Sequence, residues 1–129
     1  MRHAVVRLSE LDFTDRPYRS QDPARQVARL TDRLSLEQSR ASVWRYPDGS
    51  RGRRHRELAQ EEVIAVLEGS MAVLAGEPPE RIELPTGSIF RAGVGEPFQL
   101  RNESGAPATL LIWGAPPVTG EVEILDDLP

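Results

Sequence analysis

The sequence of 129 residues contains no cysteine and no lysine. All 16 residues counted as lysine or arginine are arginine. The absence of cysteine excludes disulfides, thiol nucleophiles and thiolate metal ligands. The absence of lysine excludes Schiff-base catalysis, a lysine-bound pyridoxal cofactor and a phosphate-loop lysine. Histidine is scarce as well, so any imidazole chemistry is confined to His3 and His55.

Long apolar runs are also missing. No run approaches the roughly 18 residues needed to cross a bilayer, and residues 1–7 hold only a very short apolar stretch. We therefore expect no secretory signal, no membrane partner and a cytoplasmic location. The net charge is −4 with both signs interspersed, unlike the concentrated positive face of a nucleic-acid-binding protein.

One dense basic stretch, residues 51–56, has four arginines and His55. It is too short and too poor in aromatic residues for a nucleic-acid site. We expect a solvated loop balanced by Glu57, Glu61 and Glu62. Attraction of carboxylated or phosphorylated substrates to this stretch is the alternative.

From residue 38 onward, short apolar runs alternate with glycine and proline turns. The runs at 62–68 and 70–75 flank Gly69 and predict a hairpin. Many short strands with turns between them favour an all-β sandwich or closed barrel. The expected strands are 38–46, 62–68, 70–75, 81–84, 88–91, 97–102, 108–113 and 121–125.

The N-terminal part is less regular. We expect a short strand at 3–8 and a polar arm through 9–22 that lies on the surface or reaches a partner subunit. Residues 24–33 fit a short helix and a strand equally well. The whole is one domain, with an arm and first strands at 1–34, a core at 35–118, and a strand and frayed tail at 119–129.

Two segments carry glycine and polar residues at fixed spacing. The first has Gly49, then five residues, His55, one residue, Glu57, four residues, Glu62, six residues and Gly69. It places an imidazole and two carboxylates between two turn glycines.

The second segment follows the same kind of pattern. It has Gly87, five residues, Gly93, one residue, Gly95, two residues, Phe98, three residues and Asn102. The two spacings occur one after the other along the chain, and isolated turn glycines would rarely produce both by chance.

Together these segments resemble the two signature motifs of the cupin superfamily. The spacing is kept, while Glu57 stands at the second histidine of the first motif. In the second motif, Gly93 replaces a proline and Phe98 replaces a histidine. The resemblance implies an all-β, cupin-type jelly-roll β-barrel that pairs as a homodimer.

The resemblance also implies a site. In metal-binding cupins the motifs supply three histidines and one glutamate to a cation, and the matching residues here are His55, Glu57 and Glu62, with Phe98 at the fourth position. Such an oxygen-rich group suits Mn²⁺ or Fe²⁺ better than zinc. Without metal, the same three residues form either an acid/base catalytic group with a raised carboxylate pKa or a hydrogen-bonded polar cluster.

Further residues are candidates for contact with a small organic ligand. If the face of residues 38, 40, 42, 44 and 46 lines the barrel, Arg40 would pair with an anionic group and Trp44 would form an aromatic wall. Phe98 would add a flat apolar surface. The alternative for Trp44 is an ordinary place in the core.

Three functions therefore stay open. The first is a small-molecule-binding cupin, such as a metal-poor isomerase, cyclase or lyase. The second is a metal-dependent, dioxygenase-like enzyme that uses His55, Glu57 and Glu62. The third is a non-catalytic ligand-sensing or interaction domain.

Overall fold

The computed structural model describes residues 2–118 and 120–129. Met1 and Thr119, the latter at the start of the expected C-terminal segment, lie outside the described residues. One 3-10 turn, Leu8–Glu10, precedes the strands. The strands are β1 (Thr14–Arg16), β2 (Arg25–Arg29), β3 (Arg40–Tyr46), β4 (His55–Glu57), β5 (Glu61–Glu68), β6 (Met71–Ala75), β7 (Glu80–Leu84), β8 (Ile89–Ala92), β9 (Phe98–Arg101), β10 (Ala108–Ala115) and β11 (Val122–Ile124).

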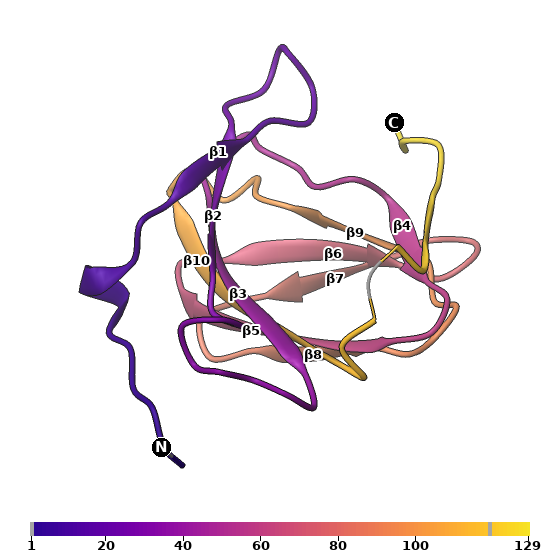
Figure 1. The fold of residues 1–129 in the computed structure, drawn as a ribbon. Coiled ribbons are helices and arrows are strands. Elements are labelled where there is room, and N and C mark those ends of the chain that lie inside the picture. Colours follow the sequence, from indigo (N-terminus) through magenta and orange to yellow (C-terminus); the bar gives the residue numbers. More distant parts are fainter. Residues whose placement is uncertain (1, 119) are drawn as a thin grey trace.

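Two antiparallel sheets make up the barrel (Figure 1). The six-stranded sheet has the order β1-β2-β3-β10-β5-β8, and the five-stranded sheet has the order β11-β4-β9-β6-β7. The all-β jelly-roll architecture expected from the sequence is confirmed. Within the described ranges, no helix is long and apolar enough to span a bilayer.

Strand alternation decides what enters the barrel. In β5, buried and half-buried residues alternate, so that Glu62 lies on the same inward face as Ile64 and Val66. The core between the sheets is formed by apolar residues such as Met71 and Leu110. The same alternation that buries the core therefore also carries one carboxylate into the barrel.

The hairpin expected around Gly69 is wrong. β5 pairs with β10 and β8, whereas β6 pairs with β7 and β9, so the chain changes sheets at Gly69. Two strands that are adjacent in sequence can pair as a hairpin or lie in different sheets, and the same run of apolar residues around a glycine fits both cases.

The two ends of the chain also differ from expectation. Residues 3–8 form no strand, and Val6 instead packs with Leu11 against a small cluster on the outer face of β3. Of the two alternatives for residues 24–33, the strand is the one observed, as β2. The tail is held rather than frayed, because Arg101 donates to the carbonyl oxygens of Leu128 and Pro129 at 2.9 and 3.1 Å.

Gly69 and Gly87 provide a matched test of the sheet crossing. Both adopt a left-handed backbone, with φ of 79° and 90°. A methyl group at Gly69 would lie 2.5 Å from the carbonyl oxygen of Pro107, whereas at Gly87 it would meet nothing within 4 Å. Gly87→Ala should lower the free energy of unfolding by about 1–2 kcal/mol, the usual strain of this backbone region.

Gly69→Ala should cost that amount plus about 1–3 kcal/mol for the steric overlap. Urea unfolding followed by circular dichroism measures both variants. Equal losses for the two would contradict the close packing of the Gly69 turn against Pro107.

Candidate functional site

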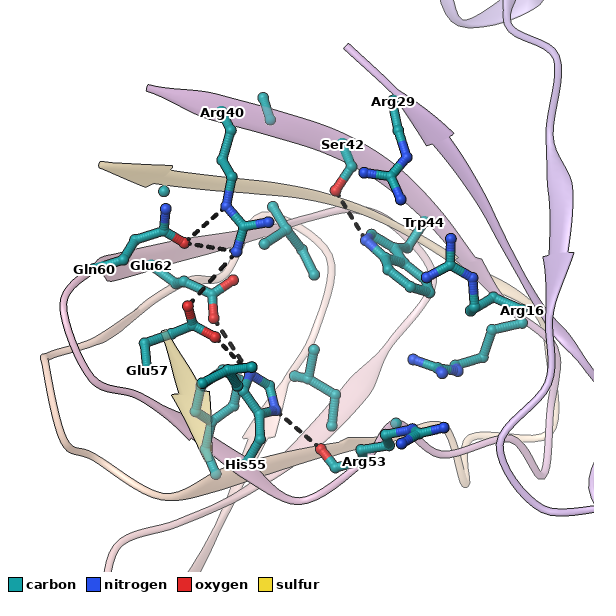
Figure 2. A pocket seen from close by; sticks show the side chains of 18 of the residues that line it. Arg16, Arg29, Arg40, Ser42, Trp44, Arg53, His55, Glu57, Gln60 and Glu62 are labelled. Carbon is teal, nitrogen blue, oxygen red and sulfur yellow. Dashed lines mark hydrogen bonds and ion pairs between the residues drawn. The ribbon is translucent and has the colours of Figure 1, made fainter. Parts of the chain in front are cut away.

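His55, Glu57 and Glu62 meet at one end of the barrel interior (Figure 2). His55 and Glu57 lie two residues apart on β4 and so share a face, while Glu62 points inward from β5. The Glu57 and Glu62 side chains are buried, with exposed fractions of 9% and 10%, and the His55 side chain is 23% exposed. The imidazole is thus the member of the group most open to the cavity.

Backbone contact fixes the imidazole. Its Nδ1 lies 3.1 Å from the carbonyl oxygen of Arg53, which can only accept, so Nδ1 carries a proton. Its Nε2 then faces Glu62 Oε1 at 3.4 Å and Glu57 Oε2 at 3.5 Å. Neutral His55 presents a lone pair at Nε2 toward the two acids, and protonated His55 presents a hydrogen-bond donor there.

The surroundings shift two pKa values in the same direction. Burial lowers the pKa of His55, but the hydrogen bonds to Glu62 and the Arg53 carbonyl, together with both carboxylate charges, outweigh burial and raise it above 6.5. Burial raises the pKa of Glu57, and the charge of Glu62 raises it further against the lowering effects of His55 and Arg40. The folded site therefore holds protons more tightly than the free side chains would.

Arg40 and Gln60 complete this end of the cavity. The guanidinium of Arg40 donates from Nε and Nη2 to Gln60 Oε1 at 3.1 and 2.9 Å, and Nη2 lies 3.6 Å from Glu57 Oε1. Gln60 is fully buried and donates to the carbonyl oxygen of Pro116 at 2.8 Å. Arg40 lines the cavity and also faces Glu57, so the pairing of its charge with an anionic ligand stays a prediction.

Gln60 is a site residue that the sequence motifs do not indicate. Its position depends on Gly114, where a methyl group would lie 2.5 Å from Gln60 Oε1. Gly114 is on β10, far away in sequence, so no local pattern links the two residues.

Phe98 packs directly against the imidazole of His55. It is the antiparallel partner of His55 on β9, and the two ring centroids lie 4.7 Å apart at 52°. The Phe98 side chain is only 2% exposed and also packs against Phe90. The Phe98 ring therefore packs beside the imidazole. Direct contact between Phe98 and a ligand stays a prediction.

The three polar residues can hold a metal ion. Their ligand atoms all lie within 4.8 Å of one another. The donor set fits a divalent cation, because the Nδ1–H bond to a carbonyl is the usual means of orienting a ligating histidine and carboxylate oxygens favour Mn²⁺ or Fe²⁺. His55 Nε2 and one oxygen each of Glu57 and Glu62 would be the ligands.

These residues line one end of a cavity of about 340 Å³. Trp44 lies at the other end, where its Nε1 donates to Ser42 Oγ at 2.9 Å. Trp44 is half-buried, so it packs against the core and lines the cavity at once. Around it lie arginines from β1 and β2 that the motifs did not indicate: Arg16, Arg25 and Arg29. Arg53, from the segment before β4, lines the cavity as well.

The basic stretch at 51–56 has other partners than those expected. Arg51 pairs with Asp127, Arg54 with Glu77 and Arg56 with Glu123. The predicted balance by Glu57, Glu61 and Glu62 is wrong for these arginines, because Glu57 and Glu62 point into the barrel toward His55 and Glu61 pairs with Arg91 outside it.

No protein-family model matches the chain, and neither does any curated protein. Solved structures do match it, among them a sugar phosphate isomerase of the cupin superfamily from Silicibacter pomeroyi. The two are 23% identical with a TM-score of 0.74, over 87% of this chain and 75% of that one. The chain has the cupin fold.

Two further cupin-like structures agree. The polyketide cyclase RemF from Streptomyces resistomycificus is 19% identical with a TM-score of 0.77, over 96% of this chain and 86% of that one. A predicted oxalate decarboxylase from Thermotoga maritima is 17% identical with a TM-score of 0.75, over 86% and 97%. At these identities the likeness describes the barrel and leaves the chemistry to the residues of this chain.

The raised pKa of His55 predicts a pH dependence. A histidine that binds its proton more tightly when folded stabilises the protein fully below pH 6.5, and this contribution is lost as pH rises through the folded pKa. Proton NMR titration should give His55 a pKa above 6.5, with the resonance assigned by comparison with His3→Gln. Glu62→Gln should lower that pKa, because it removes a hydrogen bond and a negative charge.

Glu61→Gln is the matched control, since the Glu61 carboxylate bonds to Arg91 outside the barrel. A His55 pKa at or below 6.5, or one that responds equally to both substitutions, would contradict the described geometry.

Proposed function

We propose that this cupin is an enzyme that moves a proton on a small organic molecule held in the barrel cavity, as isomerases, cyclases and lyases do. The observation that carries the proposal is the placement of His55. Its imidazole is fixed by the Arg53 carbonyl, faces two buried carboxylates and is still open to the cavity.

The protonation preferences suit acid/base work. A general acid or base is most effective when its pKa lies near the working pH. The raised pKa of His55 keeps more of the imidazole protonated near neutrality, which suits a general acid. The raised pKa of Glu57 lies closer to neutral pH than that of a free glutamate, which makes the carboxylate a stronger base.

Arg40 and Gln60 act as positioning residues in this proposal. Arg40 lies 3.6 Å from Glu57 Oε1, which leaves Glu57 Oε2 directed to His55. The two bonds from Arg40 to the buried Gln60 hold the guanidinium in that place. The carboxylate of Glu57 is thereby kept at one orientation for proton exchange with the imidazole or a ligand.

The names of the neighbouring structures are compatible with such chemistry. They include a sugar phosphate isomerase, a polyketide cyclase and a predicted oxalate decarboxylase. The homodimer and the cytoplasmic location expected from the sequence remain proposals beside this one.

Deuterium exchange provides a test that needs no product assay. Candidate sugars, sugar phosphates, keto acids and hydroxy acids would be incubated with the protein in D₂O, and carbon-bound deuterium detected by NMR. At least one compound should exchange, and His55→Ala and Glu57→Gln should each slow the exchange by about 10²-fold or more. Glu61→Gln should retain it.

Exchange that survives both site substitutions would place the chemistry elsewhere. No exchange with any compound of the panel would contradict the proposal and favour a non-catalytic ligand-binding domain.

A metal-dependent enzyme is the second candidate, and the convergence of three ligand atoms within 4.8 Å favours it. A bound divalent cation would supply a Lewis acid at the cavity end. His55, Glu57 and Glu62 would hold it from one side and leave the cavity side open to the ligand, as catalytic metal sites require.

Metal binding separates the two candidates. If the second is right, titration with Mn²⁺ followed by electron paramagnetic resonance should show about one tight site per chain, and Glu62→Gln should weaken it by about 10-fold or more. Glu61→Gln should bind like the wild type. Wild-type protein that binds neither Mn²⁺ nor Fe²⁺ would exclude this candidate and leave the metal-free proposal standing.

A further inference from the structure

The end of the cavity opposite His55 is lined by arginines without acidic partners. Arg16, Arg25 and Arg29 lie at that end around Trp44, and Arg53, from the segment before β4, lines the cavity as well; none of the four lies within 4.0 Å of a carboxylate of the described residues. Arg40, by contrast, faces Glu57. The chain carries a net charge of −4, so carboxylates are plentiful and their absence here is a local property.

Arg25 is the buried member of this arginine cluster. Its exposed fraction is 7%, its Nη1 lies 3.3 Å from the hydroxyl of Tyr46, and its guanidinium lies 4.8 Å from the centre of the Trp44 ring. Its Nε is buried and has no hydrogen-bond partner among the described residues. A buried charge with an unsatisfied donor is costly, and an anion in the cavity would supply the missing counter-charge.

The local structure accommodates this costly arrangement. Arg16 on β1 and Arg25 on β2 are direct partners in the antiparallel pairing, and like charges at such positions repel. Gly52 leaves the space that Arg25 needs, because a methyl group there would lie 2.8 Å from the Tyr46 hydroxyl and 3.3 Å from Arg25 Nη1. An anion that binds near both guanidinium groups would offset the repulsion between Arg16 and Arg25.

Figure 2 shows the opposite characters of the two ends. Arg16 and Arg29 lie around Trp44, whereas Glu57 and Glu62 lie beside His55 at the far side of the cavity. An anionic group is attracted to the arginine cluster and repelled from the carboxylates. A ligand with one anionic end therefore enters in one orientation, with its uncharged part toward His55.

We propose that the arginine cluster binds the phosphate group of a phosphorylated small molecule. A phosphate monoester carries a charge of about −1.5 to −2 and three acceptor oxygens, which can engage several guanidinium groups at once. A single carboxylate has one charge and two oxygens, and so matches four unpaired arginines less well. That the phosphorylated molecule is also the substrate rests on the proposed function.

Binding of inorganic phosphate tests the cluster directly. Calorimetric titration at fixed ionic strength, in EDTA so that no metal contributes, should show saturable binding to the wild-type protein and much weaker binding of acetate. The double variant Arg16→Gln/Arg29→Gln should weaken phosphate binding about 10-fold or more, since each charge-assisted bond is worth over 1 kcal/mol. These two side chains are exposed, so the variant should fold.

Arg45→Gln is the matched control. Arg45 is also an exposed arginine of the six-stranded sheet, but its guanidinium lies over Phe13, 3.8 Å from the ring centre, on the other face of the sheet. Arg25→Gln, checked for folding by circular dichroism, should weaken phosphate binding at least as much as the double variant. No saturable phosphate binding, or an equal loss with Arg45→Gln, would overturn the proposal.

The two proposals fail separately. Arginine-dependent phosphate binding without deuterium exchange on any compound would leave the phosphate site standing and reject the enzyme. Exchange on unphosphorylated compounds, with no phosphate binding, would reject the phosphate site and leave the enzyme.

Discussion

The burial of two carboxylates beside an apolar core is the constraint on which the rest of the site depends. Glu57 and Glu62 lie inside the barrel because strand alternation places them on the faces that also hold the core. Buried negative charges require compensation, and here it comes from His55 at 3.4–3.5 Å and from Arg40 at 3.6 Å. The Arg40–Gln60–Pro116 chain of hydrogen bonds follows from that need.

The same constraint separates the cavity into two regions. Arg40 faces the carboxylates, and its charge is used within the protein. The arginines near Trp44 have no carboxylate partner in the part of the chain that the structure describes, so their charge is available to a ligand. A positive cluster at one end of the cavity, opposite carboxylates that His55 and Arg40 compensate, orients an anionic ligand without a moving part.

The resemblance to the cupin motifs predicted the barrel and the meeting of His55, Glu57 and Glu62, while two-residue alternation by itself placed only His55 and Glu57 on one face. The sequence pattern could not place Phe98, whose position beside His55 depends on the pairing of β4 with β9. It also predicted a hairpin at Gly69 where the chain changes sheets. The spacing did not predict the position of Gln60, which depends on Gly114 of the distant strand β10. It did not predict the arginine cluster either, because the pairing of β1 with β2 brings Arg16 beside Arg25.

Phe98 shows how a motif can lose a ligand and keep its architecture. At the position where the second cupin motif has a histidine, this chain has the buried Phe98, whose ring centre lies 4.7 Å from that of His55. An apolar neighbour lowers the local dielectric, which strengthens the attraction between His55 and the two acids. A phenyl ring offers no metal ligand at this position, and the burial of His55 lowers the pKa of its imidazole while the two acids raise it. A divalent cation would occupy the same His55 Nε2 and carboxylate oxygens that hold the proton, so metal binding and proton exchange are alternatives at this site.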